Sequence, residues 1–155
     1  MISDATFTLD VGSNPMKEKV MSEAVRLVRE FCDLMETRDA EKLRSFLADD
    51  AVYQNVGMPA SFGVDDIVTN LAGQFGMFPD SYAYETINIV GDGDVVMTER
   101  LDLIGTPSGV KGVPVMGTFV LRDGKIIRWT DYFDISLPKK LMTGEDVESL
   151  IPAKY

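Results

Sequence analysis

The chain has 155 residues, and its 25 acidic against 15 basic side chains give a formal net charge of −10. This negative charge repels phosphate backbones, which disfavours nucleic acid as a partner. Hydrophobic residues make up 45% of the sequence, but the longest apolar runs are far shorter than the ~20 residues that span a bilayer. We therefore expect one domain with no membrane partner. We also expect a cytoplasmic location, because residues 1–5 lack the features of a signal peptide.

Two residue counts limit the possible chemistry. The single cysteine, Cys32, excludes an internal disulfide and any site built from several cysteines. The chain has no histidine, which excludes Ser-His-Asp triads, Cys-His pairs and histidine-ligated metals. Acid–base chemistry must then depend on carboxylates, Tyr, Lys or the thiol. We expect neither a metal nor a cofactor.

The first half of the chain is predicted to be mainly helical, after an N-terminal arm over residues 1–14. Apolar residues recur at helical spacing over residues 20–35, and Asp39 is a suitable N-cap for a second, short helix. A strand over residues 51–56 and a third helix over residues 65–75 follow.

The second half changes to the period of two that is typical of strands. Four strands are predicted, over residues 82–90, 95–104, 113–121 and 125–135, the last two joined by a tight turn at Asp123-Gly124. Residues 138–155 are predicted to form a polar tail with one helical turn near residues 145–150, so the single domain is predicted to span residues 15–137. Helices followed by strands predict an α+β fold, in which helices on a curved mixed or antiparallel sheet enclose an apolar pocket.

Residues two apart on a strand share a face, so three of these strands each place polar groups among apolar neighbours. One face of the strand over residues 95–104 has Arg100 beside Asp102. The last strand aligns Asp131 with apolar residues, namely Ile127, Trp129 and Phe133, and the first strand aligns Tyr53 with Asn55. Taken singly, Arg100 and Asp102 are expected to form a structural ion pair, and Asp131 is expected to be a buried hydrogen-bond acceptor. Tyr53 and Asn55 are expected to be ordinary polar residues of a strand.

Taken together, the same residues suggest chemistry. One arginine between two carboxylates pairs charges that would be costly to bury alone. Neighbouring carboxylates also raise one pKa, so one aspartate can stay protonated while the other is ionised. Arg100, Asp102 and Asp131 could thus supply an acid and a base at neutral pH.

Three segments carry a resemblance to a known family: Tyr53-Gln54-Asn55, Thr98-Glu99-Arg100-Leu101-Asp102 and Trp129-Thr130-Asp131-Tyr132-Phe133-Asp134. In order and spacing they resemble the signature segments of limonene-1,2-epoxide hydrolases, and the resemblance runs from the first helix to the last strand. It implies a cone-shaped fold of the nuclear transport factor 2-like (SnoaL-like) type and a homodimer. Thr130 differs from the basic residue of the family, which concerns the substrate more than the chemistry.

The resemblance also implies a role for each polar residue. Asp131 would be the general base, acting on a water molecule held by Tyr53 and Asn55. Asp102 would be the general acid that protonates the epoxide oxygen, and Arg100 would bridge the two carboxylates. The reaction would give a vicinal diol in one step, without a covalent intermediate.

Strand parity and the resemblance together predict the residues that bind substrate. The expected wall consists of Trp129, Met35, Phe78, Ile104, Val113, Val115 and Phe133. Such a wall suits an apolar epoxide of terpene-like, alicyclic or lipid type. Core packing is the alternative role for each residue, and it is the favoured one for Met35 and Phe78. Trp129 is expected to position or pack the polar network, and simple core packing is given equal weight for it.

The outer sheet face is predicted to be a subunit interface, because it is too apolar for water; its residues are Val95, Met97, Leu101 and Leu103. Two other functions remain open on this fold. One is an isomerase or cyclase of the ketosteroid-isomerase or polyketide-cyclase type, and the other is a non-catalytic small-molecule binding module.

Overall fold

The computed structural model describes residues 21–152, so the arm predicted over residues 1–14 lies outside the described part of the chain. Its core element is a six-stranded sheet with strand order β2-β1-β6-β5-β4-β3. The strands are β1 (Leu47–Asn55), β2 (Ser61–Phe62), β3 (Tyr82–Asp92), β4 (Val95–Thr106), β5 (Gly109–Arg122) and β6 (Lys125–Tyr132). The α-helices are α1 (Glu23–Asp33), α2 (Val64–Met77) and α3 (Leu137–Met142), and the 3₁₀ helices are η1 (Leu34–Thr37), η2 (Ala40–Phe46) and η3 (Glu148–Leu150).

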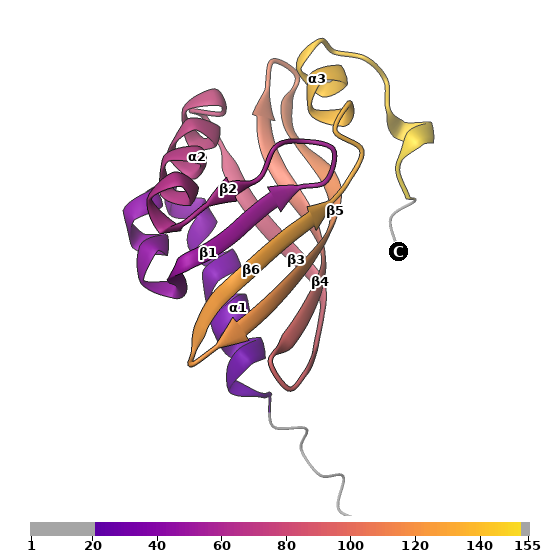
Figure 1. The fold of residues 1–155 in the computed structure, drawn as a ribbon. Coiled ribbons are helices and arrows are strands. Elements are labelled where there is room, and N and C mark those ends of the chain that lie inside the picture. The colour runs from indigo at the N-terminus through magenta and orange to yellow at the C-terminus, as the bar shows by residue number, and fades with distance from the viewer. Residues whose placement is uncertain (1–20, 153–155) are drawn as a thin grey trace, which may run out of the picture.

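The helices α1 and α2 lie on the same side of the curved sheet (Figure 1). The helix α1 packs against β3, and α2 packs against β1. Among the strands within residues 21–152, β1 and β6 pair in parallel, and the other neighbouring pairs are antiparallel. The expected α+β architecture, with helices covering one face of a curved mixed sheet, is therefore confirmed.

Local sequence signals account for several of the element ends. The helix α1 begins where the Ser22 hydroxyl accepts a hydrogen bond from the Val25 backbone, and Asp39 caps η2 through the backbone of Glu41. The predicted second helix is thus present, as a 3₁₀ helix. Asp123 and Gly124 both have positive φ, as the tight hairpin between β5 and β6 requires.

The sequence did not predict β2 or α3, and it misassigned one side chain in β6. The register of β6 shifts between its pairs with Leu121 and Val120, so Ile127 is an extra residue at a bulge. Ile126 is fully buried instead, and the expected inward position of Ile127 is wrong. The helix α3 lies near the turn between β4 and β5 (Figure 1), where Leu137 is buried.

The core fills the space between the helices and the inner sheet face. Phe31 is central to it, and its ring contacts the rings of Phe46, Phe119 and Trp129. Met35 is also fully buried in this core. Within residues 21–152, no helix has the length and apolar character needed to cross a membrane.

Candidate active site

The register of the sheet brings three sequence-distant segments together. The parallel pairing of β1 with β6 places Tyr53 beside Trp129 and Asn55 beside Asp131. A row of paired residues across the next strands runs from Thr98 on β4 to Gly117 on β5, and Gly117 in turn pairs with Asp131 on β6.

Arg100 reaches across this row and joins two carboxylates. Its Nε donates to Asp102 Oδ1 at 2.7 Å, and its Nη2 donates to Asp102 Oδ2 at 3.2 Å and to Asp131 Oδ2 at 2.6 Å. Its Nη1 donates to Thr98 Oγ1 at 3.2 Å, and its Cζ lies 4.2 Å from the centroid of the Tyr84 ring. Because Arg100 is 0% exposed, these partners replace the water that the guanidinium loses on folding.

Gly117 provides the space that this bridge needs. A Cβ atom at this position would lie 2.2 Å from Arg100 Nη1, 2.8 Å from Thr98 Oγ1 and 2.9 Å from Asp131 Oδ1. Since Arg100 is held on both sides by carboxylates, it cannot move aside without losing an ion pair. The lack of a side chain at Gly117 is therefore a condition for the contact between β4 and β6.

Asp131 is held on both of its oxygens. Arg100 occupies Oδ2, and the indole Nε1 of Trp129 donates to Oδ1 at 2.8 Å. Trp129 in turn stacks on the ring of Tyr53, with the ring centroids 3.9 Å apart. Trp129 thus holds the Asp131 carboxylate in place through this hydrogen bond. Trp129 does not line the cavity, so its expected place in the cavity wall is wrong.

Asp102 is the more accessible of the two carboxylates, with 14% of its side chain exposed against 2% for Asp131. Burial raises the pKa of Asp102 to about 7 because it penalises the charged form. The positive charge and hydrogen bonds of Arg100 oppose this rise, and the negative charge of Asp131 adds to it. A substantial fraction of Asp102 is therefore protonated at neutral pH.

A directed chain of hydrogen bonds orients the polar groups beside Asp131. The Tyr53 hydroxyl donates to Asn55 Oδ1 at 3.0 Å, and Gln74 Nε2 donates to the Tyr53 oxygen at 3.2 Å. The second Nε2 hydrogen of Gln74 goes to Asn70 Oδ1 at 2.9 Å. Because Asn55 Oδ1 accepts from Tyr53, its amide nitrogen is left free to donate within the part of the chain that the structure describes.

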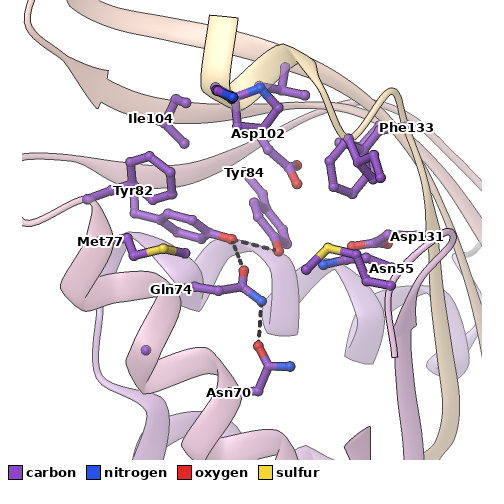
Figure 2. Close-up of a pocket in the computed structure, with 18 of the residues that line it drawn as sticks. Asn55, Asn70, Gln74, Met77, Tyr82, Tyr84, Asp102, Ile104, Asp131 and Phe133 are labelled. Carbon is purple, nitrogen blue, oxygen red and sulfur yellow. Dashed lines mark hydrogen bonds between the residues drawn. The ribbon is translucent and has the colours of Figure 1, made fainter. Parts of the chain in front are cut away.

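These groups open into one cavity of about 720 Å³. Tyr53, Asn55, Asp102 and Asp131 all line it, and Figure 2 shows Asp102 and Asp131 from different strands facing the same space. Five of the predicted wall residues also line the cavity: Phe78, Ile104, Val113, Val115 and Phe133. Met35 does not, because its buried side chain belongs to the core, and its expected role in substrate binding is wrong.

Sequence reasoning missed several lining residues. Gln74 faces the cavity from α2, Tyr82 and Tyr84 face it from β3, and Lys139 and Met142 contribute from α3. The sequence of β3 could have indicated two of these residues, because Tyr82 and Tyr84 are two positions apart on a strand and therefore share a face. Nothing comparable marked α3, which lies in a polar segment that the sequence pattern assigned to a tail.

Among residues 21–152, no group of three or more Asp, Glu or Cys side chains could hold a metal ion. Cys32 lies within the core, and burial raises the pKa of its thiol to about 12. Asp102 and Asp131 both line the cavity and accept hydrogen bonds from Arg100.

Fold and site together define a nuclear transport factor 2-like domain with a pair of carboxylates bridged by arginine. Residues 22–142 match the family model of the limonene-1,2-epoxide hydrolase catalytic domain. The chain is 36% identical over 119 residues to epoxide hydrolase EphG of Mycobacterium tuberculosis, covering 76% of this chain and 78% of that protein. The chain therefore belongs to the limonene-1,2-epoxide hydrolase family.

Solved structures agree with this assignment. An LEH-like epoxide hydrolase of M. tuberculosis matches with a TM-score of 0.65 and 30% identity, over 84% of this chain and 97% of that one. An NTF2-like protein of unknown function from Burkholderia pseudomallei matches with a TM-score of 0.70 and 15% identity, over 79% and 99%. The second match shows the fold alone, and it confirms the nuclear transport factor 2-like prediction.

Replacing Gly117 by alanine tests the packing of the site. We expect Gly117→Ala to lower the free energy of unfolding by about 1–3 kcal/mol, because the new methyl group overpacks the Arg100 bridge. Urea denaturation followed by circular dichroism measures this. Gly112→Ala on the same strand is the control, because its Cβ meets Leu101 at an ordinary 3.4 Å. Equal stability of the two variants would contradict the crowding at Gly117.

Proposed function

We propose that the protein is an epoxide hydrolase that adds water to an apolar epoxide and releases a vicinal diol in one step, without a covalent intermediate. The main support is the contact of Arg100 with both Asp102 and Asp131 at the wall of an apolar cavity. This contact keeps two carboxylates close together in different surroundings, as a paired acid and base require.

The water-activating side of the reaction uses Asp131, Tyr53 and Asn55. The hydrogen of Tyr53 is already donated to Asn55, and one lone pair of the Tyr53 oxygen accepts from Gln74. A water molecule at this place donates one hydrogen to Asp131 and the other to the Tyr53 oxygen, and it accepts one from the Asn55 amide. Its remaining lone pair is then directed at the epoxide carbon, while Asp131 takes the proton.

The ring-opening side uses Asp102. As the water oxygen bonds to a ring carbon, the bond from that carbon to the epoxide oxygen breaks, and Asp102 protonates the oxygen. Arg100 stabilises whichever carboxylate is charged at each stage. A proton then returns from Asp131 to Asp102 through solvent, which restores the starting state. General acid and general base catalysis each contribute roughly 10²–10⁴-fold.

The substrate class follows from the cavity. Its wall is mainly aliphatic and aromatic, and Phe78, Ile104, Val115 and Phe133 lie among its lining residues. A terpene-like, alicyclic or lipid epoxide fits this chemistry. An isomerase or cyclase would need one proton-shuttling aspartate, and a binding module would need neither carboxylate, so both leave the Arg100 bridge unexplained.

Substituting each carboxylate tests the assignment. We expect Asp131→Asn and Asp102→Asn each to lower kcat by about 10²–10⁴-fold, since neither amide can exchange the required proton. Diol formation from cyclohexene oxide, followed by gas chromatography, measures the loss. Asp50→Asn is the control, because it removes an exposed β1 carboxylate that pairs with Arg122, and it should keep full activity. Wild-type turnover in a folded Asp102→Asn protein would contradict the acid role.

The pH dependence tests the same role independently. A general acid works in its protonated form, and the pKa of Asp102 is raised to about 7. We therefore expect kcat/KM to fall about tenfold per pH unit above roughly pH 7. Initial rates across neutral to alkaline pH, with spontaneous hydrolysis subtracted, measure this decline. A rate that rises with pH through this range would show that Asp102 acts in its ionised form.

We also propose that the outer sheet face pairs with a second copy of the chain. Val95 and Met97 are 40% and 46% exposed on this face, and Leu101 and Leu103 are partly exposed beside them. Burying this apolar surface in a two-fold interface would remove it from water. We expect a dimer in sedimentation velocity at micromolar concentration and a shift to monomer for Met97→Glu. A stable wild-type monomer would contradict the proposal.

A further inference from the structure

The cavity contains a second polar cluster that the reaction above does not explain. Tyr82 and Tyr84 extend their phenols into it from β3, where Gln74 meets them from α2 (Figure 2). The two tyrosines are only 6% and 7% exposed. Phe78 and Ile104 line the cavity with them and offer no hydrogen-bonding side chain. Polar groups placed in an apolar wall are the kind that orient a ligand.

The direction of the hydrogen bonds determines what this cluster can bind. The Tyr82 hydroxyl donates to Gln74 Oε1 at 2.7 Å. The Tyr82 and Tyr84 oxygens are 3.3 Å apart, and Tyr84 must be the donor between them because the Tyr82 hydrogen is already used. Both amide hydrogens of Gln74 are also donated, to Tyr53 and to Asn70. The cluster therefore has unused lone pairs on its phenolic oxygens and no unused hydrogen.

We propose that Tyr82 and Tyr84 form an alcohol-binding subsite, so that the substrate is an epoxide with a hydroxyl group on an otherwise apolar skeleton. A hydroxyl can donate to either phenolic oxygen without breaking a bond of the cluster. It can also lie between the two tyrosines, accepting from Tyr84 and donating to Tyr82, and so replace their long 3.3 Å contact with two hydrogen bonds.

Other polar groups fit the cluster less well. A ketone can only accept, so it would take the Tyr84 hydrogen and leave the Tyr82 oxygen without its donor. A carboxylate would face the same shortage of hydrogens, and it would share the cavity with Asp102 and Asp131. Burial also raises the pKa of both phenols well above the ordinary value, so they stay neutral. They supply no positive charge to an anion.

The sheet register places the subsite next to the proposed acid. Tyr84 pairs directly with Asp102 across β3 and β4, and Tyr82 pairs with Ile104. Tyr82, Tyr84, Asp102 and Ile104 all line the same cavity. One substrate molecule can therefore present its epoxide oxygen to Asp102 and a hydroxyl group to the tyrosines.

The inference rests on the proposed epoxide hydrolysis, and a matched pair of substrates tests it. The probes are 4-(hydroxymethyl)cyclohexene oxide and 4-ethylcyclohexene oxide, which differ by one hydroxyl in place of a methyl group. We expect wild-type kcat/KM to favour the alcohol at least about tenfold. Tyr84→Phe should lower this ratio several-fold, because it removes the hydrogen that a bridging alcohol accepts and keeps the ring over Arg100. A wild-type ratio near one would overturn the inference, whatever the variant does.

Tyr132→Phe is the matched control, since it removes a phenol that is 51% exposed and lies outside the cavity lining. It should leave the ratio at its wild-type value. A binding measurement separates this inference from the proposed function: cyclohexylmethanol, which has no epoxide, should bind wild type about tenfold more tightly than Tyr84→Phe in an NMR titration. If neither epoxide is hydrolysed but this difference holds, the subsite stands and the activity does not. Equal binding to both proteins would overturn the subsite.

Discussion

The buried positive charge of Arg100 is the constraint on which the rest of the site depends. A guanidinium that is fully removed from water needs charged partners, and the structure provides one carboxylate on its own strand and another on β6. To connect them, the side chain must pass over β5, which is possible only because Gly117 leaves the space open. The pairing of these charges thus depends on the register of β4, β5 and β6 and on the lack of a side chain at position 117.

The same arrangement makes the two carboxylates unequal. Asp131 is enclosed and receives hydrogen bonds from Arg100 and Trp129, whereas Asp102 keeps an exposed edge toward the cavity. The hydrogen bonds that connect Tyr82, Gln74, Tyr53 and Asn55 determine which of these groups donates and which accepts. Each hydrogen in these bonds has one acceptor, and Asn55, whose amide hydrogens are left over, pairs with Asp131 in the sheet register.

The sequence was sufficient to predict the fold class, and it named the five polar residues on which the proposed reaction depends. Strand periodicity placed Arg100 beside Asp102, and the family resemblance connected them with Asp131. The cavity wall was harder to predict, because an apolar residue that faces inward can touch either core or cavity. Met35 and Phe78 are such a pair: the first is packed in the core, and the second lines the cavity.

Other misses have equally local causes. A bulge changes which residue faces inward without leaving a pattern in the sequence, and this is why Ile127 was placed on the wrong face. Gln74 lies on α2, where the spacing of apolar residues predicts the buried face. That spacing does not indicate which polar residues at the edge of the face line the cavity. The helix α3 is short and lies among polar residues, so its contact with the cavity depends on tertiary packing that no local signal encodes.

The parallel pairing of β1 with β6 has a consequence for how the molecule is made. The ribosome releases β1 long before β6, and until β6 follows, β1 has only the two-residue β2 as a partner among the described strands. A nascent chain therefore carries an unpaired sheet edge while the four intervening strands and α2 are made, which is a hazard for self-association. Asn55 meets Asp131 only when β6 pairs with β1, so the polar site forms in the last step of sheet assembly.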